Sequence, residues 1–288
     1  MDPKIHIPPG EMENIITVDL EDWFHICGVK EIMAEESWAG LESRVVANTE
    51  RILDVLYQKD TLATFFILGF IAQKNPKLIS KIHAAGHEIA THGYAHQAVY
   101  TMTQESFRED IRRACEAISV ITGQPVRGYR APEWSIRDES LWALDILREE
   151  GFQYDSSMAP LPIIGNQNYP RTPHMLELSS GNLWEFPPLA VNSILVNLPF
   201  GGGWGLRIFP YPLIRAAIRR MNRQGSPSLI YVHPREFDPC VPEFDLPFVK
   251  RLVLNARIHR TETAIDRLLS DFSFSTVSNA IKGLETNE

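Results

Sequence analysis

Two histidines, His92 and His96, stand four residues apart in the segment EIATHGYAHQ, and three acidic residues, Asp19, Glu21 and Asp22, follow the apolar run NIITV. Two histidines and one carboxylate form a common protein ligand set for a catalytic divalent metal such as Zn²⁺, with one position left open for water. The histidine spacing alone is a weak signal, and the acidic cluster is also compatible with a solvated turn. The two segments together predict a metal site if the fold brings them into contact.

Three more polar residues stand at or just after short apolar runs: Arg130 in VRGYRAP, Asp155 in FQYDSS and His233 in SLIYVHP. Catalytic groups of α/β barrels lie where strands end and loops begin. In such a site a carboxylate can act as a general base and a non-ligand histidine can protonate a leaving group. Arg130 would then orient the base and Asp155 would orient His233, although a structural ion pair and a buried loop histidine are the alternatives. The set is typical of metal-assisted hydrolysis of an amide or ester.

The elements that must position these residues alternate between short strands and amphipathic helices. Glycines stand where the helices are expected to end, at Gly86, Gly123 and Gly151. This rhythm predicts βα units and a parallel sheet or barrel. We expect strands within 14–20, 62–72, 87–92, 126–132, 152–157 and 228–238, of which the second runs into a turn or helix. We expect helices within 42–60, 75–86, 103–123, 138–151 and 210–225. Residues 160–205 are rich in Pro, Gly and Asn and are expected to form long loops with short strands.

The chain of 288 residues has 44% hydrophobic and 22% charged residues, as in an ordinary globular protein. We interpret residues 1–12 as a tail and 13–288 as one domain, whose last part, about 240–288, is a C-terminal extension with a helix, a short strand and a helix. The net charge of −8 argues against nucleic acid as a partner, because phosphate contacts need a basic footprint. The oligomeric state stays open.

The cysteines and the apolar runs bear on the compartment. The three cysteines are widely spaced, so neither a disulfide framework nor a thiolate zinc site is indicated. The N-terminal residues do not resemble a secretory signal, and no apolar run approaches the ~18 residues of a membrane span. A cytoplasmic protein without a membrane span is therefore expected.

Taken in order, the motifs TVDLED, THGYAH, GYRAPEW, FQYDSS and YVHP resemble those of the polysaccharide deacetylases with a NodB homology domain, carbohydrate esterase family 4. The match covers roughly residues 15–240. The segments TVDLEDWF, GGGWGLRIFPYPLIR and YVHPREFDP are similar to a narrower branch whose members are often encoded near exopolysaccharide and exosortase genes. The resemblance implies a distorted (β/α)7 barrel that removes acetyl groups from N-acetylated saccharides with a divalent metal, Zn²⁺ first and Co²⁺ or Ni²⁺ as alternatives.

The resemblance also implies roles for individual residues. Asp19 matches the catalytic base, His92 and His96 match the metal histidines, and Arg130 matches the arginine that holds the base. Asp155 matches the carboxylate that tunes the acid, and His233 matches the acid. Backbone N–H groups after Arg130, near Glu133, would stabilise the oxyanion.

The sequence departs from the family pattern in two places. The usual metal-binding aspartate next to the base is replaced by Leu20, which cannot bind metal, so Glu21 or Asp22 must supply the carboxylate. Strand alternation places Asp19 and Glu21 on the same face, but Asp22 stays an alternative if the strand ends here. The usual aromatic residue after the arginine motif is Glu133, followed by Trp134, and we interpret both as substrate-binding residues.

Other features allow two interpretations. Trp23, Trp134, Trp184 and Trp204 are candidates for stacking on sugar rings, with core packing as the alternative. The helix with Arg215, Arg219, Arg220 and Arg223 is interpreted first as a solvated basic face, and contact with anionic lipid or a pyrophosphate-linked sugar is the alternative. Besides sugar deacetylation, hydrolysis of a small non-sugar amide and a non-catalytic saccharide-binding protein stay as hypotheses.

Overall fold

The computed structural model describes residues 12–25, 35–242 and 254–286. Most of its strands form one nine-stranded sheet: β1 (Asn14–Leu20), β2 (Thr64–Ile67), β3 (Glu88–Thr91), β4 (Gly128–Tyr129), β5 (Tyr154–Asp155), β6 (His174–Leu178), β7 (Gly181–Glu185), β10 (Leu229–Val232) and β11 (Phe274–Ser275). A separate antiparallel hairpin consists of β8 (Ala190–Asn192) and β9 (Asn197–Pro199).

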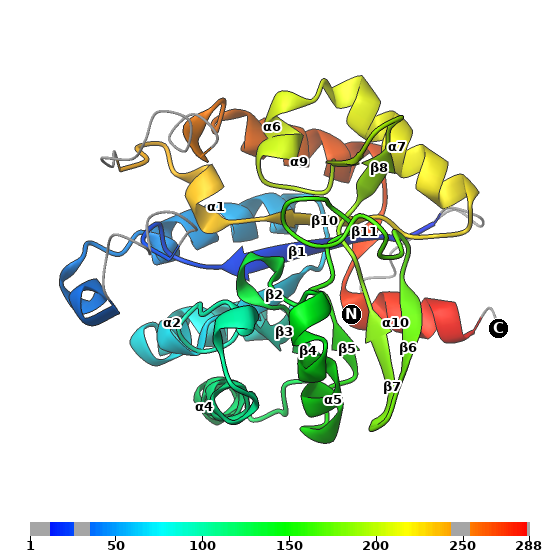
Figure 1. Cartoon of the computed structure of the whole chain (residues 1–288). Coiled ribbons are helices and arrows are strands. Elements are labelled where there is room, and N and C mark those ends of the chain that lie inside the picture. Colours follow the sequence, from blue (N-terminus) through cyan, green and yellow to red (C-terminus); the bar gives the residue numbers. More distant parts are fainter. Residues whose placement is uncertain (1–11, 26–34, 243–253, 287–288) are drawn as a thin grey trace.

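Helices surround this curled sheet (Figure 1). They are α1 (Val45–Gln58), α2 (Gly69–Lys74), α3 (Pro76–Ala84), α4 (Gln104–Thr122), α5 (Trp142–Glu149), α6 (Trp204–Ile208), α7 (Tyr211–Arg223), α9 (Arg260–Asp271) and α10 (Val277–Glu285). Short 3₁₀ turns span Glu35–Gly40, Val99–Thr101, Pro132–Trp134, Asp138–Ser140 and Pro234–Phe237. Among the described residues, no helix is long and apolar enough to cross a bilayer.

The sheet order is β10-β1-β2-β3-β4-β5-β7-β6, and β11 pairs with the beginning of β1. Neighbouring strands from β10 to β7 run parallel, and β6 is antiparallel to β7. Seven parallel strands with outer helices confirm the expected distorted (β/α)7 barrel. Parallel strands also place all of their carboxyl ends at one rim, where the predicted site residues stand.

The alternation of β1 explains which side chains reach the interior of the barrel. Ile16, Val18 and Leu20 belong to the main apolar cluster with residues of the surrounding helices. The residues between them, Thr17 and Asp19, therefore point to the opposite face, because successive side chains of a strand alternate. Leu20 is a core residue.

The expected helices and strands are present, with two refinements. Thr103 and Ser106 cap α4 reciprocally, and Gly86, Gly123 and Gly151 have φ of +86°, +68° and +87° at helix ends. The segment 160–205 contains two hairpins, one of which adds β7 to the main sheet. The C-terminal extension likewise adds β11 to β1. Residues 1–11 of the expected tail and residues 243–253 of the expected extension lie outside the described residues.

The triple-glycine segment before α6 approaches β10 closely. Gly202 forms a β-bridge with Tyr231, and a Cβ atom there would lie 2.3 Å from the Tyr231 carbonyl oxygen. Only glycine fits at this distance. The close approach brings α6, and with it Arg207, next to the end of β10.

Candidate active site

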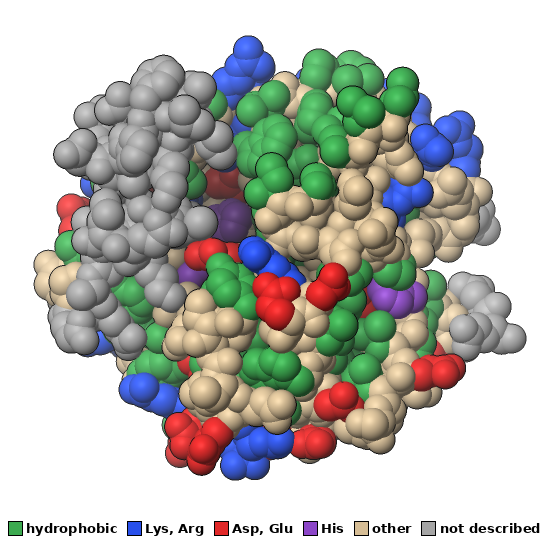
Figure 2. All heavy atoms as spheres, viewed as in Figure 1, with side chains coloured by type: hydrophobic (Ala, Val, Ile, Leu, Met, Phe, Trp, Pro, Cys, Tyr) green, Lys and Arg blue, Asp and Glu red, His purple; other side chains and the backbone are tan. Residues whose placement is uncertain are grey.

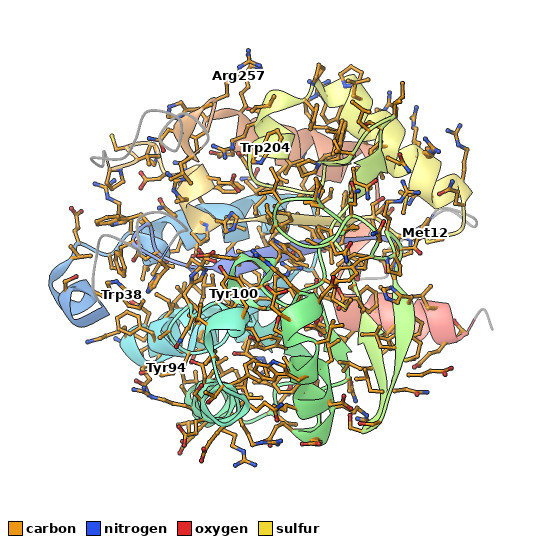
Figure 3. All side chains as sticks on the ribbon, in the orientation of Figure 1. Met12, Trp38, Tyr94, Tyr100, Trp204 and Arg257 are labelled. Carbon is orange, nitrogen blue, oxygen red and sulfur yellow. The ribbon has the colours of Figure 1, made fainter. Side chains whose placement is uncertain are left out.

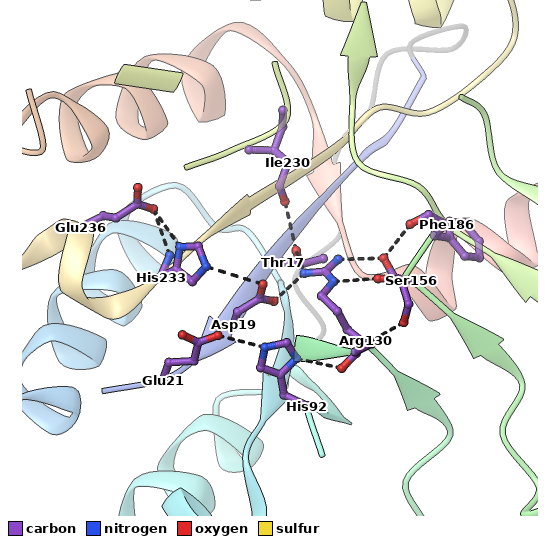
Figure 4. Close-up of polar contacts among 12 residues, drawn as sticks. Thr17, Asp19, Glu21, His92, Arg130, Ser156, Phe186, Ile230, His233 and Glu236 are labelled. Atoms are coloured by element: carbon purple, nitrogen blue, oxygen red, sulfur yellow. Dashed lines mark hydrogen bonds and ion pairs between the residues drawn. The ribbon is translucent and has the colours of Figure 1, made fainter. Parts of the chain in front are cut away.

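The strand register brings the predicted residues into neighbouring positions. Val18 pairs with Val232, so the next residues, Asp19 and His233, stand side by side. In the same way, Leu20 pairs with Ile67, Ile67 with Thr91 and Thr91 with Tyr129. The residues that follow three of these, Glu21, His92 and Arg130, therefore stand at the same level along the strands. Residues far apart in sequence therefore meet at one rim of the barrel (Figure 4).

Glu21, His92 and His96 form one compact donor set. Their ligand atoms lie within 4.8 Å of one another, and all three side chains are buried. One carboxylate oxygen, Glu21 Oε1, lies 2.9 Å from His92 Nε2 and 3.0 Å from His96 Nε2. Burial alone would raise the pKa of Glu21, but His96 and His92 outweigh it through charge and hydrogen bonds and hold the pKa well below its usual range.

The orientation of His92 fits a metal site. Its Nδ1–H donates to the carbonyl oxygen of Arg130 at 2.8 Å, so in the neutral ring Nε2 carries a lone pair. That lone pair faces the Glu21 carboxylate oxygen, and two electron-rich atoms at 2.9 Å need a shared cation or proton. A backbone carbonyl behind a ligand histidine is the usual support for metal binding. Two imidazoles and a carboxylate suit Zn²⁺, and imidazole also suits Co²⁺ and Ni²⁺.

Asp22, the alternative ligand, is turned away from this set. Its carboxylate accepts hydrogen bonds from Ser43 Oγ at 2.5 Å and from the backbone N–H groups of Trp23, Arg44 and Val45. The last two groups belong to the beginning of α1, which Asp22 therefore caps. Of the two alternatives, the geometry favours Glu21.

Arg130 is fully buried and uses its guanidinium to join three strands. Nη1 donates to Asp19 Oδ1 at 2.5 Å and to Thr17 Oγ1 at 2.8 Å. Nη2 and Nε donate to the side chain and carbonyl of Ser156. Arg130 thus holds the Asp19 carboxylate by one oxygen, Oδ1. The second oxygen, Oδ2, faces His233.

His233 lies between two carboxylates (Figure 4). Its Nε2 is 3.9 Å from Asp19 Oδ2, and its Nδ1 is 3.4 Å from Glu236 Oε2. Burial lowers the pKa of His233. The hydrogen bond to Glu236 and the charges of Glu21, Glu236 and Asp19 outweigh this effect and raise the pKa to about 9. At neutral pH the ring is therefore protonated and can donate a proton.

The expected partner of His233 was Asp155, and the structure gives that position to Glu236. Glu236 follows His233 by three residues in a 3₁₀ turn, so its carboxylate folds back to the His233 backbone N–H at 3.1 Å. Its other oxygen lies 3.5 Å from Arg207 Nε. The signal for this residue was the HPRE pattern, which resembles a capping box.

Asp155 instead faces Glu185 across β5 and β7, where the two residues are paired in register. Both are fully buried, and Asp155 also accepts from Ser157 Oγ at 2.5 Å. Burial and the nearby charge of Asp155 raise the pKa of Glu185 well above its usual value, so Glu185 keeps its proton beside the Asp155 carboxylate. Sequence reasoning missed Glu185 because its segment was interpreted as loop.

The two expected substrate-binding residues differ in their surroundings. Glu133 is partly exposed, and its φ of +58° is an uncommon backbone conformation of the kind found at functional sites. Trp134 is buried and packs over Arg130, with 4.6 Å from the guanidinium carbon to its ring. Its packing role is thus favoured over sugar stacking. Trp23 and Trp184 are buried as well, and Trp204 is partly exposed.

The loop after β4 also offers one backbone donor. Ala131 N–H donates to Ser157 Oγ, Trp134 N–H donates to Ala131 O, and Ser135 N–H donates to Pro132 O. Pro132 has no N–H group. The N–H of Glu133 makes no hydrogen bond with any residue that the structure describes, and it is therefore the candidate donor for an oxyanion.

Comparisons with known proteins indicate the family of part of the chain and the fold of the whole. Residues 39–154 match the family model described as polysaccharide deacetylase, and residues 156–282 match a domain of unknown function, DUF3473. A peptidoglycan-N-acetylglucosamine deacetylase from Bacillus cereus is 33% identical over 98 residues, which are 34% of this chain and 36% of that protein. The chain thus matches about a third of that relative's length.

Solved structures show the same fold over the whole chain. A putative polysaccharide deacetylase from Mycobacterium smegmatis has a TM-score of 0.64 at 21% identity, covering 98% of this chain and 93% of that one. A structure described as a CE4 family pseudoenzyme from Bacillus anthracis has a TM-score of 0.50 at 15% identity, covering 94% and 66%. Residues 39–154 thus form a polysaccharide deacetylase domain by sequence, and the whole chain has the fold of these solved structures.

Proposed function

We propose that this protein is a metal-dependent hydrolase that removes N-acetyl groups from an amino-sugar-containing saccharide. The observation that carries the proposal is the pairing of Asp19 with His233, 3.9 Å apart, beside the donor set of Glu21, His92 and His96. A base, an acid and a metal-ligand set at one rim are the groups that amide hydrolysis needs.

Glu21, His92 and His96 would hold the metal, most simply Zn²⁺. A divalent cation bound there lowers the pKa of a water molecule and polarises a carbonyl group. Asp19 takes a proton from the attacking water while Arg130 keeps its carboxylate in place. The N–H of Glu133 donates to the carbonyl oxygen as negative charge develops.

His233 completes the reaction by donating its Nε2 proton to the amide nitrogen as the C–N bond breaks. The products are acetic acid, which is released as acetate, and a free amine. Asp19 then passes the proton that it took from water to His233, which restores the protonated acid. Glu236 orients the ring and favours its protonated form, since its carboxylate lies at Nδ1. In this proposal Asp155 acts through Ser157, which donates to it. The Ser157 hydroxyl also accepts a hydrogen bond from the Ala131 N–H, so Asp155 helps to position the loop before Glu133.

The motifs shared with the exopolysaccharide-associated branch support a polysaccharide or its precursor as substrate. We propose the cytoplasm as its compartment, because Cys115 and Cys240 are free thiols and Cys240 is exposed, which fits a reducing environment.

Acetate release from N-acetylglucosamine oligomers tests the proposal, with metal content measured in parallel on the wild type and on His92→Ala. We expect about one metal per chain in the wild type, loss of metal in His92→Ala, and acetate release that Asp19→Asn and His233→Ala abolish. Metal without acetate would redirect the search to small non-sugar amides. A wild type that stays free of metal after addition of zinc or cobalt would favour a non-catalytic saccharide-binding protein.

A further inference from the structure

The hairpin β8–β9 carries an unusual tip. Its four-residue loop, Ser193–Val196, is closed by a Ser193 N–H bond to the Val196 carbonyl, and Asn192 pairs with Asn197. The two central positions are Ile194 and Leu195, which are 102% and 85% exposed. Such positions normally hold Gly, Asn, Asp, Ser or Pro, each for a reason of turn geometry. Neither the turn nor the core explains two large aliphatic side chains here.

The tip belongs to a larger apolar surface. Five of the twelve large hydrophobic side chains that are exposed among the described residues fall within residues 194–213: Ile194, Leu195, Val196, Ile208 and Leu213. We call this set the apolar edge. Figure 2 shows hydrophobic side chains gathered where Figure 1 labels α6, α7 and β8, and the surface is hollowed beside them at a histidine. Exposed apolar patches of this kind mark interaction sites.

Positive charge continues the apolar edge along α7. The exposed face of this helix is apolar at its beginning, with Pro212, Leu213 and Ala216, and basic at its end, with Arg219, Arg220 and Arg223. These three arginines form no ion pair within the part of the chain that the structure describes. A cluster of free cations is notable in a chain with a net charge of −8.

A hollow beside α7 is also basic. A cavity of about 540 Å³ is lined by Arg215, Arg219, Arg223 and Arg267 together with Asp271. Asp271 pairs with Arg215, so the lining keeps an excess of positive charge. Its size and charge suit a phosphate headgroup. Arg257 adds a further exposed cation, and Figure 3 shows it projecting from the upper edge of the molecule, near which Trp204 begins α6.

We propose that the apolar edge and the arginines of α7 dock on an anionic phospholipid bilayer. Ile194 and Leu195 insert at the boundary of headgroups and acyl chains, and the arginines bind lipid phosphates. Aliphatic side chains flanked by Lys or Arg are the composition of peripheral membrane-binding surfaces, and the cytoplasmic leaflet supplies the negative charge. Docking in this way does not depend on the proposed reaction.

Vesicle co-sedimentation of the full chain tests the proposal, with phosphatidylcholine vesicles compared with phosphatidylcholine–phosphatidylglycerol vesicles. The wild type should bind the anionic vesicles and lose binding in high salt. The double variant Ile194→Ser, Leu195→Ser should weaken binding by roughly ten-fold or more, because serine does not gain the free energy of transferring apolar surface from water into the bilayer. The triple variant Arg219→Gln, Arg220→Gln, Arg223→Gln should weaken it by about five-fold per charge.

Matched controls come from other faces of the molecule. Val120→Ser removes an 81% exposed aliphatic side chain from α4, and Lys74→Gln, Lys77→Gln, Lys81→Gln removes three positive charges from α2 and α3. Both should bind as the wild type does. Hairpin variants should release acetate from soluble oligomers at the wild-type rate, so a failure of the deacetylase proposal would leave the binding result interpretable.

Equal binding by the wild type and both test variants would overturn the proposal, as would no binding of the wild type to anionic vesicles. In the second case, size-exclusion chromatography with light scattering would show whether the apolar edge instead joins two copies of the chain, in which event the double variant would be the monomer.

Discussion

His233 Nε2 lies 3.9 Å from Asp19 Oδ2, while its other ring nitrogen is 3.4 Å from the carboxylate of Glu236. The imidazole is therefore held at both ends by acidic groups that come from different elements. Asp19 is fixed in turn by Arg130, so the position of the proposed acid depends on a chain of four side chains.

Glu236→Gln should shift the alkaline limb of the pH–rate profile to lower pH. The acid must be protonated, so activity falls as the pH rises through the pKa of His233, which the nearby carboxylates of Glu236 and Asp19 raise above its ordinary value. Removing the Glu236 charge removes one of the causes that raise it. Profiles of kcat for the wild type, Glu236→Gln and Asp155→Asn would measure this, and an unchanged limb in Glu236→Gln would argue for a purely structural glutamate.

Glu21→Gln and Asp22→Asn should have opposite effects on metal and stability. Glu21→Gln removes a proposed ligand and should lower the metal content well below one per chain. Asp22→Asn should keep the metal and lose about 1–2 kcal/mol of unfolding free energy, because it weakens the cap of α1. Mass spectrometry and urea denaturation separate the two, and loss of metal in Asp22→Asn alone would reverse the ligand assignment.

Arg130→Met should destabilise the protein by about 3–5 kcal/mol, since it leaves the Asp19 carboxylate buried without its counter-charge. The double variant Arg130→Met, Asp19→Asn should recover part of that loss. Both variants should be inactive. Urea denaturation of the two single variants and the double variant gives the coupling energy, and additive effects would contradict the ion pair.

Glu185→Gln should make the protein more stable than the wild type at high pH. The pKa of Glu185 is raised in the folded state by burial and by Asp155. Its contribution to stability is therefore complete below the unfolded pKa, near 4.5, and is lost as the pH rises through the folded pKa. Glutamine is neutral at every pH and has no proton to lose, so the stability curves of the two proteins should diverge with rising pH in denaturation experiments.

Much of this site follows from sequence because of strand alternation and parallel strands. Apolar runs that end in polar residues placed Asp19, His92, Arg130 and His233 at one rim, and the register confirms their contacts. The choice between Glu21 and Asp22 needed the structure, since it depends on where β1 ends and on a hydrogen bond from Ser43, a residue distant in sequence.

The parts that escaped prediction depend on long-range pairing. Glu185 meets Asp155 only because β7 joins the sheet, and nothing in the segment 160–205 indicates which strand would do so. Glu236 is different, because its spacing from His233 was readable in the sequence and was overlooked in favour of the family pattern.

The position of β1 between β10 and β2, with β11 also paired to its beginning, has a consequence for folding. This strand, which carries Asp19 and ends at Leu20, is synthesised before the other strands, but two of its partners, β10 and β11, are synthesised after all of them. Such pairing across most of the sequence has a high contact order and slows folding. The proposed acid and base can meet only after β10 has emerged, so a nascent chain would hold the apolar strand β1 half-paired and exposed to chaperones until then.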